Sequence, residues 1–192
     1  MKKLRIAGHL FFLAYFLMAL FYYKEIMLYS DNAFQCFKLV NFGTFNVEAS
    51  RYSTFFVQLI PLVAVKLHLP LKIILPLYSV SFPVLYYSVY LLCVYGIGSD
   101  AAGILMILTL SLCTRQSFYY AFTETFQALV YCVLFYAFFN REKISEDEFH
   151  PSQNQNKLWM IFKKSGMHVF ICLLLILLCY FAHPVSLLSS IS

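Results

Sequence analysis

The stretch LRIAGHLFFLAYFLMALFYYKEIML, residues 4–28, decides the fold of this 192-residue chain. A helix of about 20 mostly apolar residues crosses a membrane hydrocarbon core of ~30 Å, and this stretch meets that length. The chain as a whole is 61% hydrophobic, with a mean hydropathy of +0.74. We therefore predict an all-α integral membrane protein, a polytopic bundle of about five to six transmembrane helices.

The N-terminal residues favour an uncleaved first helix. Lys2, Lys3 and Arg5 precede the apolar run, as they would in a secretory signal peptide. However, the run is longer than the roughly 7–15 residues of a signal core, and no A-x-A-like cleavage site follows it. Because positive charges favour the cytoplasmic side, we expect a cytoplasmic N-terminus in a bacterial inner membrane.

The net charge and the cysteines exclude several classes of site. The formal charge of +5 is more naturally an orientation signal in a membrane protein than a nucleic-acid footprint, so no nucleic-acid partner is expected. The six cysteines mostly lie in apolar runs and form no C-x-x-C motif, which argues against zinc and a disulfide framework. The segment Gly96-Ile97-Gly98 is too short to form a phosphate-binding loop.

Further apolar stretches set the number of crossings. Three are long enough to span, residues 71–95, 117–139 and 166–188. Residues 140–165 form a predicted cytoplasmic loop, because they carry Arg141, Lys143, Lys157, Lys163 and Lys164. Because the N-terminus and this loop are both cytoplasmic, an even number of crossings must lie between them. The first helix, residues 71–95 and residues 117–139 supply three. Just one of two shorter stretches, 53–69 and 101–113, therefore crosses.

Two assignments of the shorter stretches stay open. In the first, residues 101–114 cross, and residues 53–69, interrupted by Pro61, form an exterior interfacial or re-entrant helix. In the second, residues 53–69 cross and place Lys66, His68 and Lys72 inside, and residues 101–113 form the half-helix. Charge counting slightly favours the second assignment, whereas the resemblance described below favours the first, which we adopt.

Residues 29–52 form the predicted exterior juxtamembrane loop. Ser30 or Asp31 can cap a short helix, and Gly43 can end it. Within it, apolar and polar residues follow one another at three-residue spacing: Phe34, Phe37 and Val40, then Gln35, Lys38 and Asn41. This pattern predicts an amphipathic helix that lies on the membrane with its apolar edge among the headgroups.

Asp31 is the first candidate catalytic residue. It is either a helix cap or a carboxylate that accepts a proton or binds a metal at the interface. Glu48 and Arg51 would pair on a helix, or Arg51 would face a lipid phosphate. His183, close to the exterior end of the last apolar stretch, is a weaker candidate for a phosphate contact.

Glu124 is the second candidate, because a carboxylate within an apolar segment is costly. Tyr120, Gln127 and Tyr131 lie at i−4, i+3 and i+7 from it and complete one polar stripe. The stripe either joins helices by hydrogen bonds or lines an outward-opening polar cavity. Arg115, at the rim of such a cavity, could hold an anionic group, or it could extend to the interface as a structural arginine.

The order of these features resembles the GT-C superfamily of membrane glycosyltransferases. The resemblance covers residues 1 to about 139 and implies sugar transfer from a polyprenyl-phosphate donor at the outer face. Asp31 would match the acid of the first exterior loop, residues 51–61 the juxtamembrane element, and Arg115 with Glu124 the later acidic turn. Asn32 stands where many members have a second acid, and the chain is shorter than the family, as expected of an N-terminal portion.

The leading hypothesis is therefore a GT-C-like transferase formed by one transmembrane domain, residues 1–192. Asp31 would be its base or metal ligand, and Arg115, Arg51, Glu48 and His183 would bind substrate around Glu124. Its expected partners are membrane lipid and the lipid-linked sugar donor, and a divalent metal is a possible cofactor. A transporter or flippase using Glu124 and a non-catalytic membrane subunit are the alternatives. The sugar, the acceptor and the oligomeric state stay open.

Overall fold

The computed structural model describes residues 2–47, 54–112 and 124–147, together with helical residues 173, 174 and 177. All regular structure in these residues is helical, which confirms the predicted all-α class. The elements are α1 (Lys2–Phe21), α2 (Tyr23–Met27), α3 (Ser30–Phe42), α4 (Thr54–Lys66), α5 (Leu71–Leu91), the π-helix η1 (Leu92–Ile97), α6 (Asp100–Leu112) and α8 (Glu124–Asp147).

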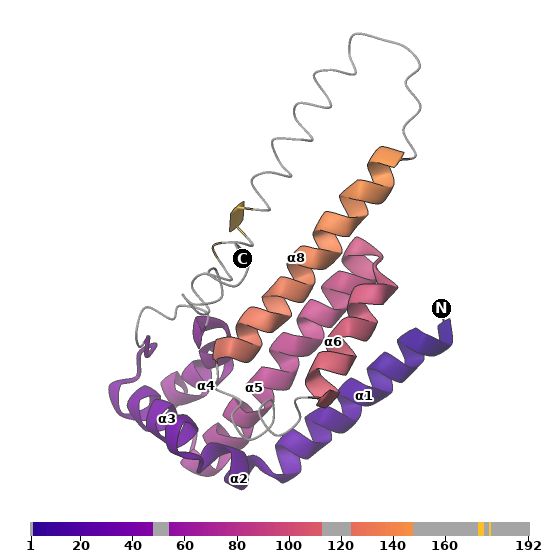
Figure 1. The fold of residues 1–192 in the computed structure, drawn as a ribbon. Coiled ribbons are helices and arrows are strands. Elements are labelled where there is room, and N and C mark those ends of the chain that lie inside the picture. Colours follow the sequence, from indigo (N-terminus) through magenta and orange to yellow (C-terminus); the bar gives the residue numbers. More distant parts are fainter. Residues whose placement is uncertain (1, 48–53, 113–123, 148–172, 175–176, 178–192) are drawn as a thin grey trace.

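Four helices form a bundle, and three short ones gather at one end of it. Helices α1, α5, α6 and α8 run alongside one another, whereas α2, α3 and α4 lie together where α1 ends and α5 begins (Figure 1). Helices α1 and α5 are antiparallel. The hydroxyl of Ser79 donates to the carbonyl oxygen of Ala19 at 2.8 Å, and the hydroxyl of Tyr90 donates to the carbonyl oxygen of Arg5 at 3.4 Å.

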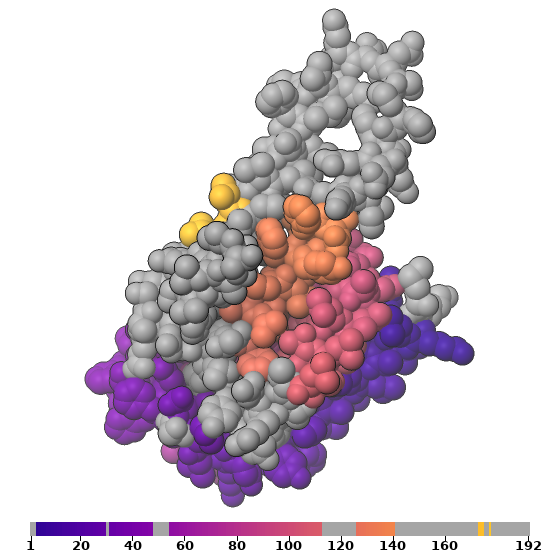
Figure 2. Space-filling view, viewed as in Figure 1, coloured from indigo at the N-terminus to yellow at the C-terminus, as the bar shows by residue number. Residues whose placement is uncertain are grey.

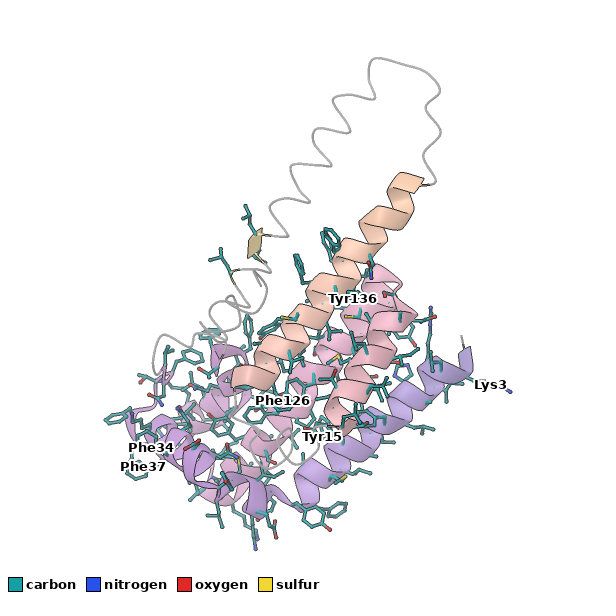
Figure 3. The ribbon with its side chains drawn as sticks, viewed as in Figure 1. Lys3, Tyr15, Phe34, Phe37, Phe126 and Tyr136 are labelled. Carbon is teal, nitrogen blue, oxygen red and sulfur yellow. The ribbon has the colours of Figure 1, made fainter. Side chains whose placement is uncertain are left out.

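Aromatic side chains of α5 make up much of the core. Tyr78, Phe82, Tyr86 and Tyr90 are almost completely buried on this helix. They pack with residues of α1 and α8, which Figure 3 shows on either side through Tyr15 and Phe126. The bundle interior is therefore apolar in bulk but contains several phenolic hydroxyls.

Two helices among the described residues are long and apolar enough to cross a membrane. They cover Lys3–Phe21 and Leu71–Ile97. Helices α4 and α6 have 13 residues each, about 20 Å at 1.5 Å per residue, and therefore remain the short segments that the sequence indicated. The apolar part of α8, Phe126–Asn140, is also shorter than a full span.

Helix α8 continues beyond its apolar residues to Asp147, so the first part of the predicted cytoplasmic loop, residues 140–147, is helical. Arg141, Glu142 and Lys143 are good helix formers. The rest of the predicted cytoplasmic loop and nearly all of the stretch 166–188 lie outside the described residues.

Large apolar side chains cover the outer surface of α1. Ile6, Leu10, Leu13, Leu17 and Phe21 are all exposed. Figure 2 shows the surface of α1 to α3, in indigo and violet, along the lower edge of the molecule. A continuous apolar surface of this kind marks contact with another protein or with a membrane.

Candidate functional site

Asp31 lies in the first turn of α3 and does not cap it. The cap position belongs to Tyr29, whose backbone is extended (φ −63°, ψ 141°) and whose side chain makes no capping hydrogen bond. The predicted capping role of Ser30 or Asp31 is therefore wrong, because the helix begins one residue earlier. The Asp31 side chain is exposed, and a carboxylate in a first turn interacts favourably with the helix dipole.

The predicted end of this helix is confirmed. Gly43 adopts a left-handed conformation (φ 58°), and its N–H donates to the carbonyl oxygen of Leu39 at 3.0 Å. Glycine adopts this conformation at little cost, whereas a residue with Cβ would be strained.

Helix α3 exposes phenylalanines and buries amides. Phe34 and Phe37 are 49% and 64% exposed and point away from the bundle (Figure 3). Asn32 and Gln35 are buried on its inner side. The predicted sorting of the faces is thus correct for the two phenylalanines, whereas Gln35 faces the bundle. Cys36 and Leu39 are buried as well, and Asp31 and Asn41 are exposed, so each side of α3 carries both apolar and polar residues.

Buried amides attach the end of α3 to α4. Gln58 of α4 accepts a hydrogen bond from the backbone N–H of Asn46 and donates one to its carbonyl oxygen, both at 2.8 Å. The side-chain amide of Asn46 in turn donates to that of Gln35. At the start of α3, the side-chain amide of Asn32 donates to the carbonyl oxygen of Ile26 in α2 at 2.5 Å. This network fixes the orientation of α3, and with it the position of Asp31.

Glu124 is the first residue of α8, at the same end of the bundle as α3. Helix α8 runs in the direction of α5, from the end that carries α2 to α4 (Figure 1). On α8, Gln127 and Tyr131 of the predicted polar stripe are both buried, so this part of the stripe faces the interior. The side chain of Glu124 lies outside the description, as do residues Tyr120, Glu48, Arg51, Arg115 and His183.

A second group of polar residues lies at the opposite end of the bundle. Arg5 of α1 donates from Nε to Oδ1 of Asp100 at 2.8 Å and from Nη2 to Oδ2 at 3.3 Å. Its guanidinium also lies 5.4 Å from the ring centroid of Tyr95. A two-point contact of this kind fixes orientation as well as distance, so α1 is held against the start of α6.

His9 joins the same group one turn further along α1. Its Nδ1 lies 2.9 Å from the hydroxyl of Tyr87, and its Nε2 lies 2.8 Å from that of Tyr95. In a neutral imidazole one nitrogen donates and the other accepts, so both contacts can be hydrogen bonds. Tyr95 belongs to η1, and π-helical turns of this kind are frequent at functional sites.

Sequence reasoning missed this group because Arg5 was interpreted only as an orientation signal. Two features could have indicated it. Arg5 and His9 are four residues apart and hence share a helix face. Asp100 is the only acidic residue in the sequence between Glu48 and Glu124. It is therefore the only carboxylate of that segment with which a cation such as Arg5 could pair.

The described residues contain no group of three or more His, Cys, Asp or Glu side chains that could hold a metal ion. Cys36 of α3 is also a poor nucleophile, because burial raises the pKa of its thiol to about 11. The chain matches no protein-family model, no curated protein and no solved structure.

Proposed function

We propose that this chain is embedded in a membrane as a bundle of five to six crossings, with α3 in the outer interface. The exposed apolar surface of α1 and the exposed Phe34 and Phe37 support this placement. Burying a phenylalanine in an apolar phase is worth about 1.5–3 kcal/mol relative to leaving it in water. A bilayer around α1 and beside α3 supplies that phase.

Within this membrane domain we propose a GT-C-like glycosyltransferase that uses a polyprenyl-phosphate donor. One observation carries the proposal: the exposed carboxylate of Asp31 and the start of α8, where Glu124 lies, are at the same end of the bundle. Asp31 acts as the general base or as a ligand of a divalent metal. Arg115 and Arg51 hold the donor phosphate, and Glu48 and His183 make further contacts to the substrate.

The test is sugar transfer by the full chain in proteoliposomes. The donors are a panel of radiolabelled monosaccharides linked to polyprenyl phosphate. We expect Asp31→Asn to reduce turnover by about 10²–10⁴-fold, the usual contribution of a positioned proton acceptor. The matched control is Glu25→Gln, which removes another exposed carboxylate on the neighbouring helix α2. Wild-type turnover in Asp31→Asn would refute the assignment.

The arrangement across the membrane needs a separate test. Single cysteines at positions 31, 66 and 154 are introduced into a chain without its native cysteines and labelled with an impermeant maleimide from either side. We expect positions 31 and 66 to react from outside and position 154 from inside. Labelling of position 66 from inside would instead support the assignment in which residues 53–69 cross.

A transporter is the second candidate. It is favoured by Gln127 and Tyr131, which are buried in the bundle and follow Glu124 closely in the sequence. A polar stripe inside an apolar bundle is typical of an ion or substrate path. Loss of activity in Glu124→Gln, with Asp31→Asn harmless, would favour transport. Retention of a tightly bound partner on purification, with both substitutions harmless, would favour a non-catalytic subunit.

A further inference from the structure

The outer face of α3 combines phenylalanines with a lysine. Phe34, Lys38 and Phe42 are four residues apart and hence follow one line along the helix. Both phenylalanines are exposed, and so is Phe37 beside them. Figure 3 shows Phe34 and Phe37 pointing away from the bundle, at the end opposite to Lys3. This face therefore contacts whatever surrounds the protein at that end.

The ring of Phe34 fixes the position of the charge on Lys38. The Nζ of Lys38 lies over this ring, 4.3 Å from its centroid, a distance at which an ammonium is attracted to an aromatic face. In the membrane placement proposed above, on which this inference rests, the ring lies at the boundary between headgroups and acyl chains. Because a lysine extends its charge toward the polar side, the ammonium then lies at the level of the lipid phosphates.

A second lysine lies at the end of the same helix. Lys66 is the last residue of α4, and its Nζ lies 3.8 Å from the position that a Cβ of Gly43 would occupy. Gly43 caps α3 directly after Phe42. Lys66 is exposed, and none of the described carboxylates forms an ion pair with it. Two helices thus bring positive charges to one stretch of α3, residues 38–43.

The charge and the apolar surface of this end both match an anionic lipid. The described residues 22–47 and 54–78 carry more lysines than carboxylates: Lys24, Lys38, Lys66 and Lys72, against Glu25 and Asp31. Exposed Phe21 and Leu28 continue the apolar surface of α1 toward α3. An acidic soluble protein would match the lysines but not the row of phenylalanines. An apolar face with basic residues beside it is typical of helices that bind anionic membranes.

We propose that the outer face of α3, together with Lys66 of α4, binds the phosphate groups of anionic phospholipids such as phosphatidylglycerol. Phe34, Phe37 and Phe42 anchor the helix in the interface, and Lys38 and Lys66 select the headgroup. Each basic residue at the surface of an anionic leaflet favours binding about fivefold. Salt weakens this selection, because ions screen charges in contact with water. The selection does not depend on sugar transfer.

Local quenching of fluorescence tests whether anionic lipid gathers at α3. Phe42→Trp, in a full chain that also carries Trp159→Phe, places a single tryptophan beside both lysines. This reporter chain is reconstituted in phosphatidylcholine vesicles that contain a minor fraction of phosphatidylglycerol. Bromine is carried either by the phosphatidylglycerol or by an equal amount of the phosphatidylcholine. We expect the brominated phosphatidylglycerol to quench about twofold more strongly, and high salt should remove this excess.

Substitutions in the reporter chain identify the residues responsible. The excess should disappear in Lys38→Gln with Lys66→Gln and remain in Lys38→Arg with Lys66→Arg, which keep the charges. Lys3→Gln is the matched control, because it removes a lysine at the opposite end of the bundle (Figure 3) and should leave the excess unchanged.

The outcomes separate this inference from the membrane placement of α3. Equal quenching by the two lipids overturns the inference and leaves the placement intact. An excess that survives Lys38→Gln with Lys66→Gln, or one that Lys3→Gln removes, also overturns it. Absence of quenching by either lipid refutes the placement as well.

Discussion

Substitution of Gly8 by alanine tests how α1 packs on α5. An ideal Cβ at Gly8 would overlap the hydroxyl of Tyr90 and lie 2.6 Å from its Cζ. The ring cannot easily move away, because Tyr90 is 2% exposed and its Cε2 would lie 3.2 Å from a Cβ at Gly103 of α6. Overpacking of this kind costs about 1–3 kcal/mol. At roughly 2–4 °C per kcal/mol for a chain of this size, we expect Gly8→Ala to lower the melting temperature by about 2–12 °C.

The measurement is thermal unfolding of the full chain in nanodiscs, with a second glycine as control. Gly96→Ala adds the same methyl group to η1, where the nearest side-chain atom, Cδ2 of Leu92, would be 3.8 Å away. That is an ordinary contact, so this control should change the melting temperature little. A Tyr90→Leu substitution should make the effect of Gly8→Ala smaller, because the two residues are in contact. Equal stability of Gly8→Ala and the wild type would refute this account of the helix contact.

Three further predictions concern other parts of the chain. Because the pKa of Cys36 is about 11, its thiolate fraction at pH 8 is about one in a thousand. Alkylation of Cys36 by iodoacetamide should therefore be far slower in the folded than in the denatured chain, and equal rates would contradict its burial. Folding raises the pKa of the Cys36 thiol above the usual value of 9.0, because burial favours the neutral form. The free energy of unfolding should therefore fall as the pH rises from about 9 to 11. A Phe37→Trp substitution in a chain whose native Trp159 is replaced provides a single fluorescent tryptophan on α3. Brominated lipids should quench its fluorescence, and an emission maximum typical of tryptophan in water would place α3 away from the bilayer. A double-mutant cycle with Arg5→Gln and Asp100→Asn should give a coupling of about 0.2–1 kcal/mol that falls with added salt, since both side chains are partly exposed. A coupling that salt leaves unchanged would contradict an electrostatic pair.

Local sequence signals identified the helices well. The apolar runs gave α1 and α5 closely, and Gly43 gave the end of α3, because both depend on residues near one another in the chain. The start of α3 was missed by one residue, since Tyr29 adopts the extended cap conformation without a capping side chain. The apolar stretch alone does not give the end of α8, because charged helix formers continue the helix beyond its apolar part.

Contacts between distant residues could not be read from the sequence. The pairing of Arg5 with Asp100 joins residues 95 positions apart, and it depends on α1 and α6 meeting at one end of the bundle. Similarly, the π-helical turn that brings Tyr95 to His9 has no clear sequence signature. Glu124 and Asp31 were singled out for their rarity in apolar surroundings, which identifies candidates but does not place them relative to each other.

The way α3 is held makes Asp31 a clean position for mutation. Neutral amides of Gln35, Asn46 and Gln58 attach the end of this helix to α4, and Asn32 attaches its start to Ile26. The Asp31 side chain is exposed and forms neither a hydrogen bond nor an ion pair with the described residues. An exposed substitution away from such contacts usually changes stability by less than about 0.5 kcal/mol. A loss of turnover in Asp31→Asn would therefore reflect chemistry at the carboxylate, because the fold that positions the helix does not depend on it.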